Sequence, residues 1–271
     1  MIITLTTDFG TADTFVGQMK GVILGIAPGA TVVDLTHEVP PQDTVAGALA
    51  VESAVDAFPD GTIHVVVVDP GVGTSRRALA VRATRHVYVG PDNGVLTLAL
   101  RRDEPVAMVD VTNPRYLRPR PSATFHGRDV FAPAAAYLAT GVPLTDLGPA
   151  VDHAIALGLP QPDVTPEGVT AHVLAADRFG NLVTDLTGAA LSAWLGGHDA
   201  GGVTVHAGEQ AIAGVRRTYG DVPQGAMVAY VGSGGRLEVA RRGGSAAALL
   251  GLKRGHPVHL VRANASAAPQ P

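Results

Sequence analysis

The N-terminal part of the chain alternates between short β-branched runs and segments with helical periodicity, and few folds accommodate this alternation. Strands are expected at Ile2–Thr7, Thr31–Leu35 and Thr62–Val68, and a helix is expected at about Asp43–Ala57. Asp8 would then stand at the carboxyl end of the first strand. The apolar positions that recur at helical spacing after that strand are Phe15, Met19, Val22, Ile23 and Ile26.

Strands and helices that alternate in this way favour a mostly parallel sheet covered by helices. Two further strands are expected at Ala78–Ala83 and His86–Val89, and a helix at Asp129–Ala139 with Asp129 as its N-cap. We therefore predict an α/β fold class, with a sandwich-like N-terminal domain built around that sheet.

The stretch Gly158–Gly168 holds three prolines and has the composition of an interdomain linker. We expect an N-terminal α/β domain at 1–157, the linker at 158–168, a smaller β-barrel-like domain at 169–263 and a disordered tail at 264–271. The strands expected in the second domain are Val169–Ala175, Val203–His206, Met227–Val231, Leu237–Ala240 and Pro257–Val261.

Composition narrows the functional classes. The chain has 271 residues, 46% of them hydrophobic, which is enough for two modest cores. A net charge of -4 argues against nucleic acid as a partner, and the absence of cysteine excludes disulfides, thiolate nucleophiles and cysteine-bound zinc. The N-terminus lacks a basic leader, and no apolar run approaches a membrane span. We expect a cytoplasmic enzyme.

The segment VVDPGVGTSRR places a carboxylate at a strand end, ahead of a Pro/Gly loop and two arginines. Asp69 and Arg76 could both face one cleft. The alternative is that Asp69 only caps the turn through backbone amides. In TFHGRDVFAP, His126 and Gly127 precede an expected helix start, where electron-rich ligands are favoured. A single histidine is more often structural, and Arg128 could simply pair with the following aspartate.

Two segments of the second domain also carry polar residues at turns. In ADRFGNLVTD, Asp177 and Asn181 flank a Phe-Gly turn; they could form the turn, or the Asn181 amide could read the edge of an adenine. The glycines of YVGSGGRLEVARRGG would let backbone amides approach a ligand, although a tight β-hairpin explains them equally. This segment is neither a Walker loop nor a Rossmann fingerprint.

Taken together, these segments resemble the S-adenosyl-L-methionine hydroxide adenosyltransferase family, whose relatives include the fluorinase and chlorinase. The resemblance covers nearly the whole chain and depends on seven segments in the family's order. They are LTTDFGTADTFVGQMKGVI, VDLTHEVPPQD, VVDPGVGTSRR, GPDNGVL, TFHGRD, DRFGNLVTD and GSGGRLEVA.

The resemblance implies hydrolysis of S-adenosyl-L-methionine to adenosine and L-methionine. It matches Asp69, Arg76 and His126 to the family's set that positions the attacking water or hydroxide. The substrate-binding residues that it implies are Asp8 on the ribose hydroxyls, Asp177 and Ser233 around the methionine amino-acid group, Asn181 on the adenine, and Arg241 on the ligand side.

Physical chemistry agrees with this expectation. A sulfonium departs as a neutral thioether, so the leaving group needs no strong acid. Water is a poor nucleophile, and the sequence offers no obvious metal cage to activate it. A fixed guanidinium at Arg76 could stabilise developing hydroxide, with His126 accepting or relaying a proton and Asp69 holding the pair in register. We expect no cofactor and no metal.

Some positions depart from the related halogenases. Gly234 and Arg242 stand where a larger basic residue and an asparagine are expected, and Gln42 replaces a tryptophan. The segment Gly94–Val106 is short and lacks the loop associated with halogenating relatives, which also lack a histidine at His126. The last two features favour water over halide as the nucleophile.

Other functions would use the same ligand. A halogenase would need a small, dry halide pocket, a sensor would bind without activating a nucleophile, and a methyltransferase would need a Gly-rich loop that TTDFGTAD does not provide. The resemblance also implies a homotrimer in which Asp8 and Asn181 of different subunits contact one small-molecule substrate. Neither nucleic acid nor membrane is expected as a partner.

Overall fold

The computed structural model describes residues 1–262, so the tail expected at 264–271 lies outside the described residues. The chain divides into two compact units, Met1–Leu157 and a second that begins at Gly158. Each is described by itself. None of the helices within residues 1–262 is long and apolar enough to cross a bilayer.

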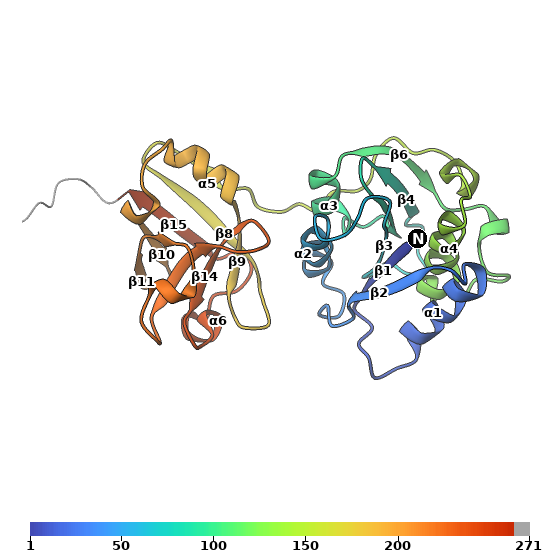
Figure 1. The fold of residues 1–271 in the computed structure, drawn as a ribbon, viewed down its shortest axis with the longest axis horizontal. Helices are drawn as coiled ribbons and strands as arrows, with labels where there is room; N and C mark the ends of the chain where they lie inside the picture. The colour runs from blue at the N-terminus through green and yellow to red at the C-terminus, as the bar shows by residue number, and fades with distance from the viewer. Residues whose placement is uncertain (263–271) are drawn as a thin grey trace, which may run out of the picture. The chain divides into compact units, whose positions relative to one another are not determined.

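The first unit contains a six-stranded sheet in the order β2-β1-β3-β5-β4-β6 (Figure 1). Its strands are β1 (Ile2–Thr7), β2 (Thr31–Thr36), β3 (Ile63–Val67), β4 (Ala78–Ala83), β5 (Val87–Pro91) and β6 (Pro105–Asp110). The pairs β2–β1, β1–β3 and β3–β5 are parallel, whereas β4 runs antiparallel to both of its neighbours. The prediction of a mostly parallel sheet in an α/β fold is confirmed.

Helices cover both faces of this sheet (Figure 1). They are α1 (Phe15–Ile26), α2 (Thr44–Ala54), α3 (Thr97–Arg102) and α4 (Ala132–Ala139). Helices α1 and α4 share one apolar core with the sheet, which includes Val65 and Val67. Helices α2 and α3 share the other, which includes Val66 and Val68. Successive β3 residues therefore point to opposite cores, and the strand reads as a continuous apolar run because both faces are buried.

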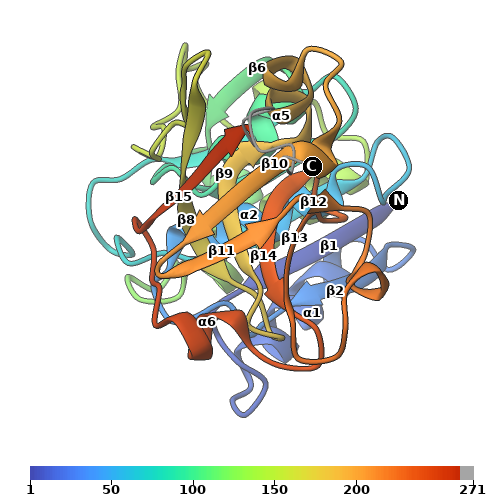
Figure 2. The same ribbon diagram turned by 90° about the vertical axis from the view of Figure 1, so that its left-hand side faces the viewer.

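The second unit forms a nine-stranded, nearly barrel-shaped sheet in the order β11-β10-β15-β8-β9-β14-β13-β12, with β7 paired to β8 (Figure 2). Its strands are β7 (Asp163–Val164), β8 (Gly168–Ala176), β9 (Leu182–Thr187), β10 (Val203–Ala207), β11 (Gln210–Ala213), β12 (Val215–Arg216), β13 (Met227–Val231), β14 (Arg236–Arg241) and β15 (Pro257–Arg262). The expected barrel-like second domain is confirmed. The strand β9 and the helices α5 (Gly188–Leu195) and α6 (Ala246–Leu250) were not predicted.

The prediction that Asp129 caps the last helix of the first unit is wrong. Helical backbone begins at the π-helical turn η2 (Gly127–Phe131), which runs directly into α4. Asp129 lies inside this turn, 2% exposed, and accepts hydrogen bonds from the Ser122 backbone N–H at 2.8 Å and from Arg128 Nε at 2.7 Å. Although burial opposes its charge, these donors hold the pKa of Asp129 below its usual value.

A buried histidine lies in the sheet core of the first unit. His64 is 1% exposed, its Nδ1 is 2.8 Å from Thr4 Oγ1, and its ring contacts the rings of His86 and Tyr88 at centroid distances of 4.9 and 5.3 Å. Its Nε2 is buried and has no hydrogen-bond partner among residues 1–262. Burial first, and then the neighbouring His86, lower the pKa of His64 to about 4.

His64 should make the protein sensitive to acid. Because its pKa is about 4 in the folded chain and about 6.5 in an unfolded chain, the unfolded state binds more protons between these values. The free energy of unfolding should therefore be insensitive to this group above pH ~6.5 and should fall by about 2–3 kcal/mol as pH drops to about 4. Urea denaturation at several pH values measures the effect.

The variant His64→Gln removes the titrating ring, so its unfolding free energy should fall less between pH ~7 and ~4.5 than that of the wild type. The exposed His198 offers a matched control, since His198→Gln should retain the wild-type acid sensitivity. Equal pH dependence in His64→Gln and the wild type would contradict the assignment.

Candidate active site

The first unit has a cavity of about 360 Å³ at the carboxyl ends of β1 and β3. Asp8 follows β1, and Asp69 follows β3; because these strands are adjacent and parallel, both carboxylates reach the same edge of the sheet. His126, on the loop before η2, also lines the cavity. Three residues singled out in three separate segments therefore meet in one place.

Arg76 joins Asp69 to His126. Its Nε donates to both carboxylate oxygens of Asp69, at 3.0 and 3.1 Å, and its Nη2 also bonds to Asp69 Oδ2. The same Nη2 lies 2.7 Å from His126 Nδ1. The side chains of Arg76 and Asp69 are only 9% and 5% exposed, so this pair is far better shielded from solvent than a surface ion pair.

The Pro/Gly loop after β3 brings Arg76 to His126. Gly73 in this loop has φ +78°, and a Cβ there would lie 2.6 Å from the carbonyl oxygen of Ala123. Only glycine allows the loop to pack this closely against the segment that carries His126. Gly73 therefore allows the loop to bring Arg76 next to His126.

The partners of His126 determine which ring nitrogen carries its proton. A guanidinium can only donate, so Arg76 Nη2 is the donor and His126 Nδ1 the acceptor. Burial, followed by the positive charge of Arg76, lowers the pKa of His126. The neutral ring therefore carries its hydrogen on Nε2 and offers a donor. In this arrangement Nδ1 is already an acceptor for Arg76 and Nε2 carries the hydrogen, so the ring presents a donor to the cavity; the expectation that His126 accepts or relays a proton stays a prediction.

Asp8 is held in place by an unusual backbone position. Its Oδ2 accepts a 2.7 Å hydrogen bond from the backbone N–H of Gln42, which has φ 64°. A non-glycine residue in this left-handed region is uncommon and carries strain. One Asp8 oxygen is thereby fixed at the cavity, and the carboxylate retains further acceptor sites.

An aromatic cluster forms part of the cavity wall. Phe9, Phe15 and Phe125 line it, with ring centroids 5.2–5.8 Å apart. No sequence motif predicted this cluster, although Phe9 and Phe125 each adjoin a candidate residue. Aromatic faces attract cations and contact sulfur favourably, so this wall suits a cationic sulfur group.

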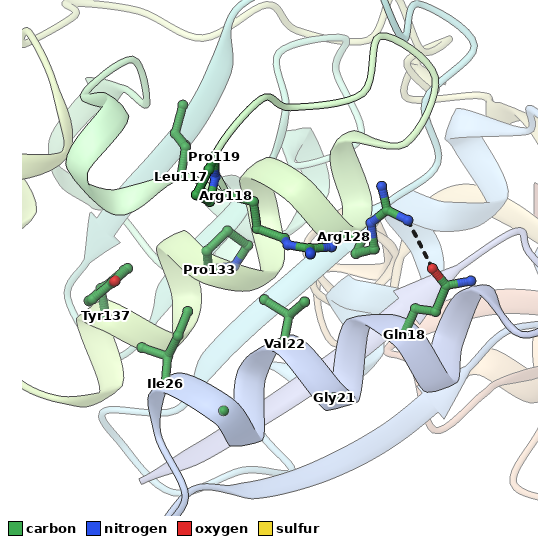
Figure 3. A pocket seen from close by; sticks show the side chains of 11 residues that line it. Gln18, Gly21, Val22, Ile26, Leu117, Arg118, Pro119, Arg128, Pro133 and Tyr137 are labelled. Atoms are coloured by element: carbon green, nitrogen blue, oxygen red, sulfur yellow. Dashed lines mark hydrogen bonds between the residues drawn. The ribbon is translucent and has the colours of Figure 1, made fainter.

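A second cavity of the first unit, about 440 Å³, lies between α1 and the η2–α4 segment (Figure 3). Arg128 lines it and donates a 2.9 Å hydrogen bond to Gln18 of α1. Arg128 also pairs with Asp129, as the simpler interpretation of the TFHGRD segment expected. None of Asp8, Asp69, Arg76 and His126 lines this cavity.

The second unit has a cavity of about 580 Å³ that includes Asn181 and Arg241. Phe179, 76% exposed, and Tyr219 supply aromatic surface there. Asp177 forms the turn that carries Asn181: its Oδ1 accepts from the backbone N–H groups of Phe179 and Asn181, both at 2.9 Å. The turn-forming interpretation of Asp177 therefore holds, and its exposed carboxylate has further lone pairs available.

Ser233 lies on the turn between β13 and β14 and is not among the residues that line the Asn181 cavity. Arg241, at the end of β14, lines it and donates from Nε to the Gly225 carbonyl at 3.1 Å. The structure thus brings Asn181 and Arg241 to one cavity, whose lining does not include Ser233. Within residues 1–262, no group of three or more histidine and acidic side chains is arranged to bind a metal ion.

Comparison with known proteins identifies relatives along nearly the whole chain. Residues 3–148 match the SAM hydroxide adenosyltransferase N-terminal domain, and residues 171–259 match the C-terminal domain of the same family. The chain is 47% identical over 265 residues to an (R)-S-adenosyl-L-methionine hydrolase of Thermus thermophilus, covering 94% of this chain and 97% of the relative. A hydrolase of the same name from Salinispora arenicola is also 47% identical, over 263 residues (96% and 97%).

More distant relatives and solved structures complete the comparison. A fluorinase of Actinopolyspora mzabensis is 29% identical over 290 residues, covering 96% of this chain and 97% of the fluorinase. A crystal structure of an uncharacterized conserved protein from Thermotoga maritima superposes with a TM-score of 0.89 at 35% identity, covering 97% of this chain and all of that one.

Proposed function

The chain belongs to the SAM hydroxide adenosyltransferase family, and from this premise we propose that it hydrolyses (R)-S-adenosyl-L-methionine to adenosine and L-methionine. The structural observation that carries the proposal is the cluster in which Arg76 joins Asp69 to His126 at the cavity that Asp8 also lines. A charged cluster of this kind suits the activation of water.

In the proposed reaction, a water-derived oxygen attacks the ribose C5′ atom as the C5′–S bond breaks. The bonding electron pair goes to sulfur, which leaves as the neutral thioether of methionine, and the proton of the water passes to solvent. Attack by hydroxide on a sulfonium neutralises charge, so a shielded site favours the transition state over the separated ions.

The cluster supports this step by holding an electron-rich oxygen. His126 Nε2–H is available as a hydrogen-bond donor, and the buried guanidinium of Arg76 places a positive charge behind the ring. Asp69 fixes the guanidinium through its bidentate contact. In this proposal His126 stabilises hydroxide by donation, and the Phe9–Phe15–Phe125 wall faces the sulfonium.

The substrate-binding roles follow the family resemblance and remain proposals. Asp8 would bind the ribose hydroxyls, and Asn181 would bind the adenine with Arg241 beside it. Asp177 and Ser233 would contact the amino-acid part of the substrate. The proposed reaction requires neither a cofactor nor a metal, because in it protein side chains activate the nucleophile. A cytoplasmic location stays a prediction.

A homotrimer is part of the proposal. The resemblance implies that Asp8 of one subunit and Asn181 of a neighbour bind the same substrate molecule. If so, activity depends on the assembly rather than on the single chain.

The first experiment incubates the purified protein with S-adenosyl-L-methionine, with and without chloride or fluoride, and separates the products by chromatography. We expect adenosine and methionine in equal amounts, unaffected by halide, with about one proton released per turnover. A 5′-halo-adenosine would instead indicate a halogenase, the activity named for the more distant fluorinase relatives. Tight binding without product would indicate a sensor.

A further inference from the structure

A chain of hydrogen bonds runs from the Asn181 cavity into the interior of the second unit. Asn181 Nδ2 donates to the hydroxyl of Tyr219 at 2.9 Å, the Tyr219 hydroxyl bonds to that of Tyr230, and Tyr230 donates to Glu238 Oε2 at 2.6 Å. Nothing in the proposed reaction requires Tyr230 or Glu238. This series of hydrogen bonds therefore needs a separate explanation.

This series of hydrogen bonds crosses two neighbouring strands, and the register of their pairing sets the positions of Tyr230 and Glu238. Tyr230 of β13 and Glu238 of β14 are directly opposite each other in an antiparallel pair. Glycine at position 232 leaves room for the Glu238 carboxylate, because a Cβ there would clash with it. Burial raises the pKa of Tyr230 far above its usual value, so its hydroxyl stays protonated and serves as a donor to Glu238.

Both N–H groups of the Asn181 amide are bound within the protein. One meets Tyr219, and the other donates to Asp177 Oδ2 at 2.7 Å. A carboxylate cannot donate, so the amide nitrogen and not its oxygen must face Asp177. Among residues 1–262, none is found to donate to Asn181 Oδ1, and Asn181 lines the cavity although it is 3% exposed, so Oδ1 is the part of the amide left for a ligand.

We infer that Tyr219, Tyr230 and Glu238 are positioning residues that hold the Asn181 amide so that it presents only an acceptor, and that this arrangement selects purines with a 6-amino group. The inference rests on the proposed function, which places adenine at Asn181. A 6-amino group donates to Oδ1. A 6-oxo purine would place its own acceptor there and leave two oxygens facing each other without a hydrogen.

The test measures binding of the product-like nucleosides adenosine, inosine and purine riboside by calorimetry, which requires no turnover. The wild type should bind adenosine about 100-fold more tightly than inosine, with purine riboside between them. In Tyr219→Phe one amide N–H is released and can turn toward the 6-oxo group, so the ratio should fall to about tenfold.

Glu238→Gln should lower the ratio similarly, because an amide at position 238 can donate to Tyr230 and reverse the direction of the hydroxyl chain. The matched control is Glu209→Gln, the same chemical change at an exposed turn, which should keep the wild-type ratio. Thermal melting checks the fold, and Tyr230→Phe replaces either variant that fails to fold.

A merely structural role would weaken adenosine and inosine equally and leave the ratio unchanged in both variants, which would overturn the inference. Equal wild-type affinity for the two nucleosides, or no adenosine binding at all, would also overturn it. The outcome is separable from the proposed function. A protein that prefers adenosine but forms no product refutes only the hydrolase, and one that forms product without base preference refutes only the positioning role.

Discussion

Arg76→Ala is expected to lower kcat for S-adenosyl-L-methionine hydrolysis by about 100-fold to 1,000-fold, whereas substrate affinity should change by less than about threefold. The guanidinium holds Asp69 through Nε and Nη2 and fixes His126 through Nη2. Its removal leaves the Asp69 carboxylate, 5% exposed, without its counter-charge and frees the imidazole to rotate. Single-turnover kinetics separate the chemical step from binding.

Arg76→Lys provides the sharper comparison. Lysine keeps the charge but cannot reproduce the planar contact with Asp69 and His126 together, so most of the loss in kcat should persist. Arg82→Ala on β4, an exposed position, is the control and should leave both parameters unchanged. A variant at position 76 that loses affinity as much as kcat would show that Arg76 binds substrate and does not act on the nucleophile.

Losses at Arg76 and His126 should not add, because the two residues work as one unit. His126→Ala removes the Nε2–H donor, and the double variant should be little worse than the more damaged single variant. Additive losses would indicate that each acts on the substrate independently.

The sequence predicted the first unit better than the second, for physical reasons. Strands such as β1 and β3 are buried on both faces, so they appear as continuous β-branched runs. In the second unit, β9 follows the Phe-Gly turn directly and α5 begins at its next residue, Gly188. The turn residues before β9 obscure the start of the strand, and no change in composition marks the point where β9 ends and α5 begins.

The error at Asp129 has a similar origin. An aspartate ahead of an apolar helical pattern usually caps the helix, but tertiary partners overrode the local preference. Ser122 and Arg128 satisfy the carboxylate inside the turn, so the helix can begin earlier. Such contacts are invisible in the sequence because they depend on how the preceding loop folds back.

In the candidate site, too, some features could be predicted from the sequence and others depend on the fold. Asp69 and Arg76 lie in one short segment, so their proximity could be anticipated, whereas their contact with His126 depends on the packing of a distant loop. The Tyr230–Glu238 pair follows from the register of the β13–β14 hairpin, which the sequence-based prediction did not assign. The resemblance to a family supplied the grouping of residues, and the structure supplied the direction of each hydrogen bond.

Mixing two inactive variants should restore activity if each site uses two subunits. Arg76→Ala removes the side chain that joins Asp69 to His126 at the cavity of the first unit, and Asn181→Ala removes a residue that lines the cavity of the second. When the two chains are co-expressed in equal amounts, a working site combines the intact first unit of an Asn181→Ala chain with the intact second unit of an Arg76→Ala chain. Random assembly gives about one such site in four, so activity should recover to about a quarter of wild type. Separate affinity tags verify that mixed assemblies have formed.

A second mixture provides the control. Arg76→Ala with His126→Ala places both lesions in the first unit, so every site remains defective in any arrangement and no activity should return. If the substrate binds within a single chain, the Arg76→Ala and Asn181→Ala mixture should also stay inactive, because each chain carries one lesion. Recovery of activity in the first mixture alone therefore requires active sites shared between subunits. If neither mixture is active although the tags verify mixed assemblies, shared active sites are excluded.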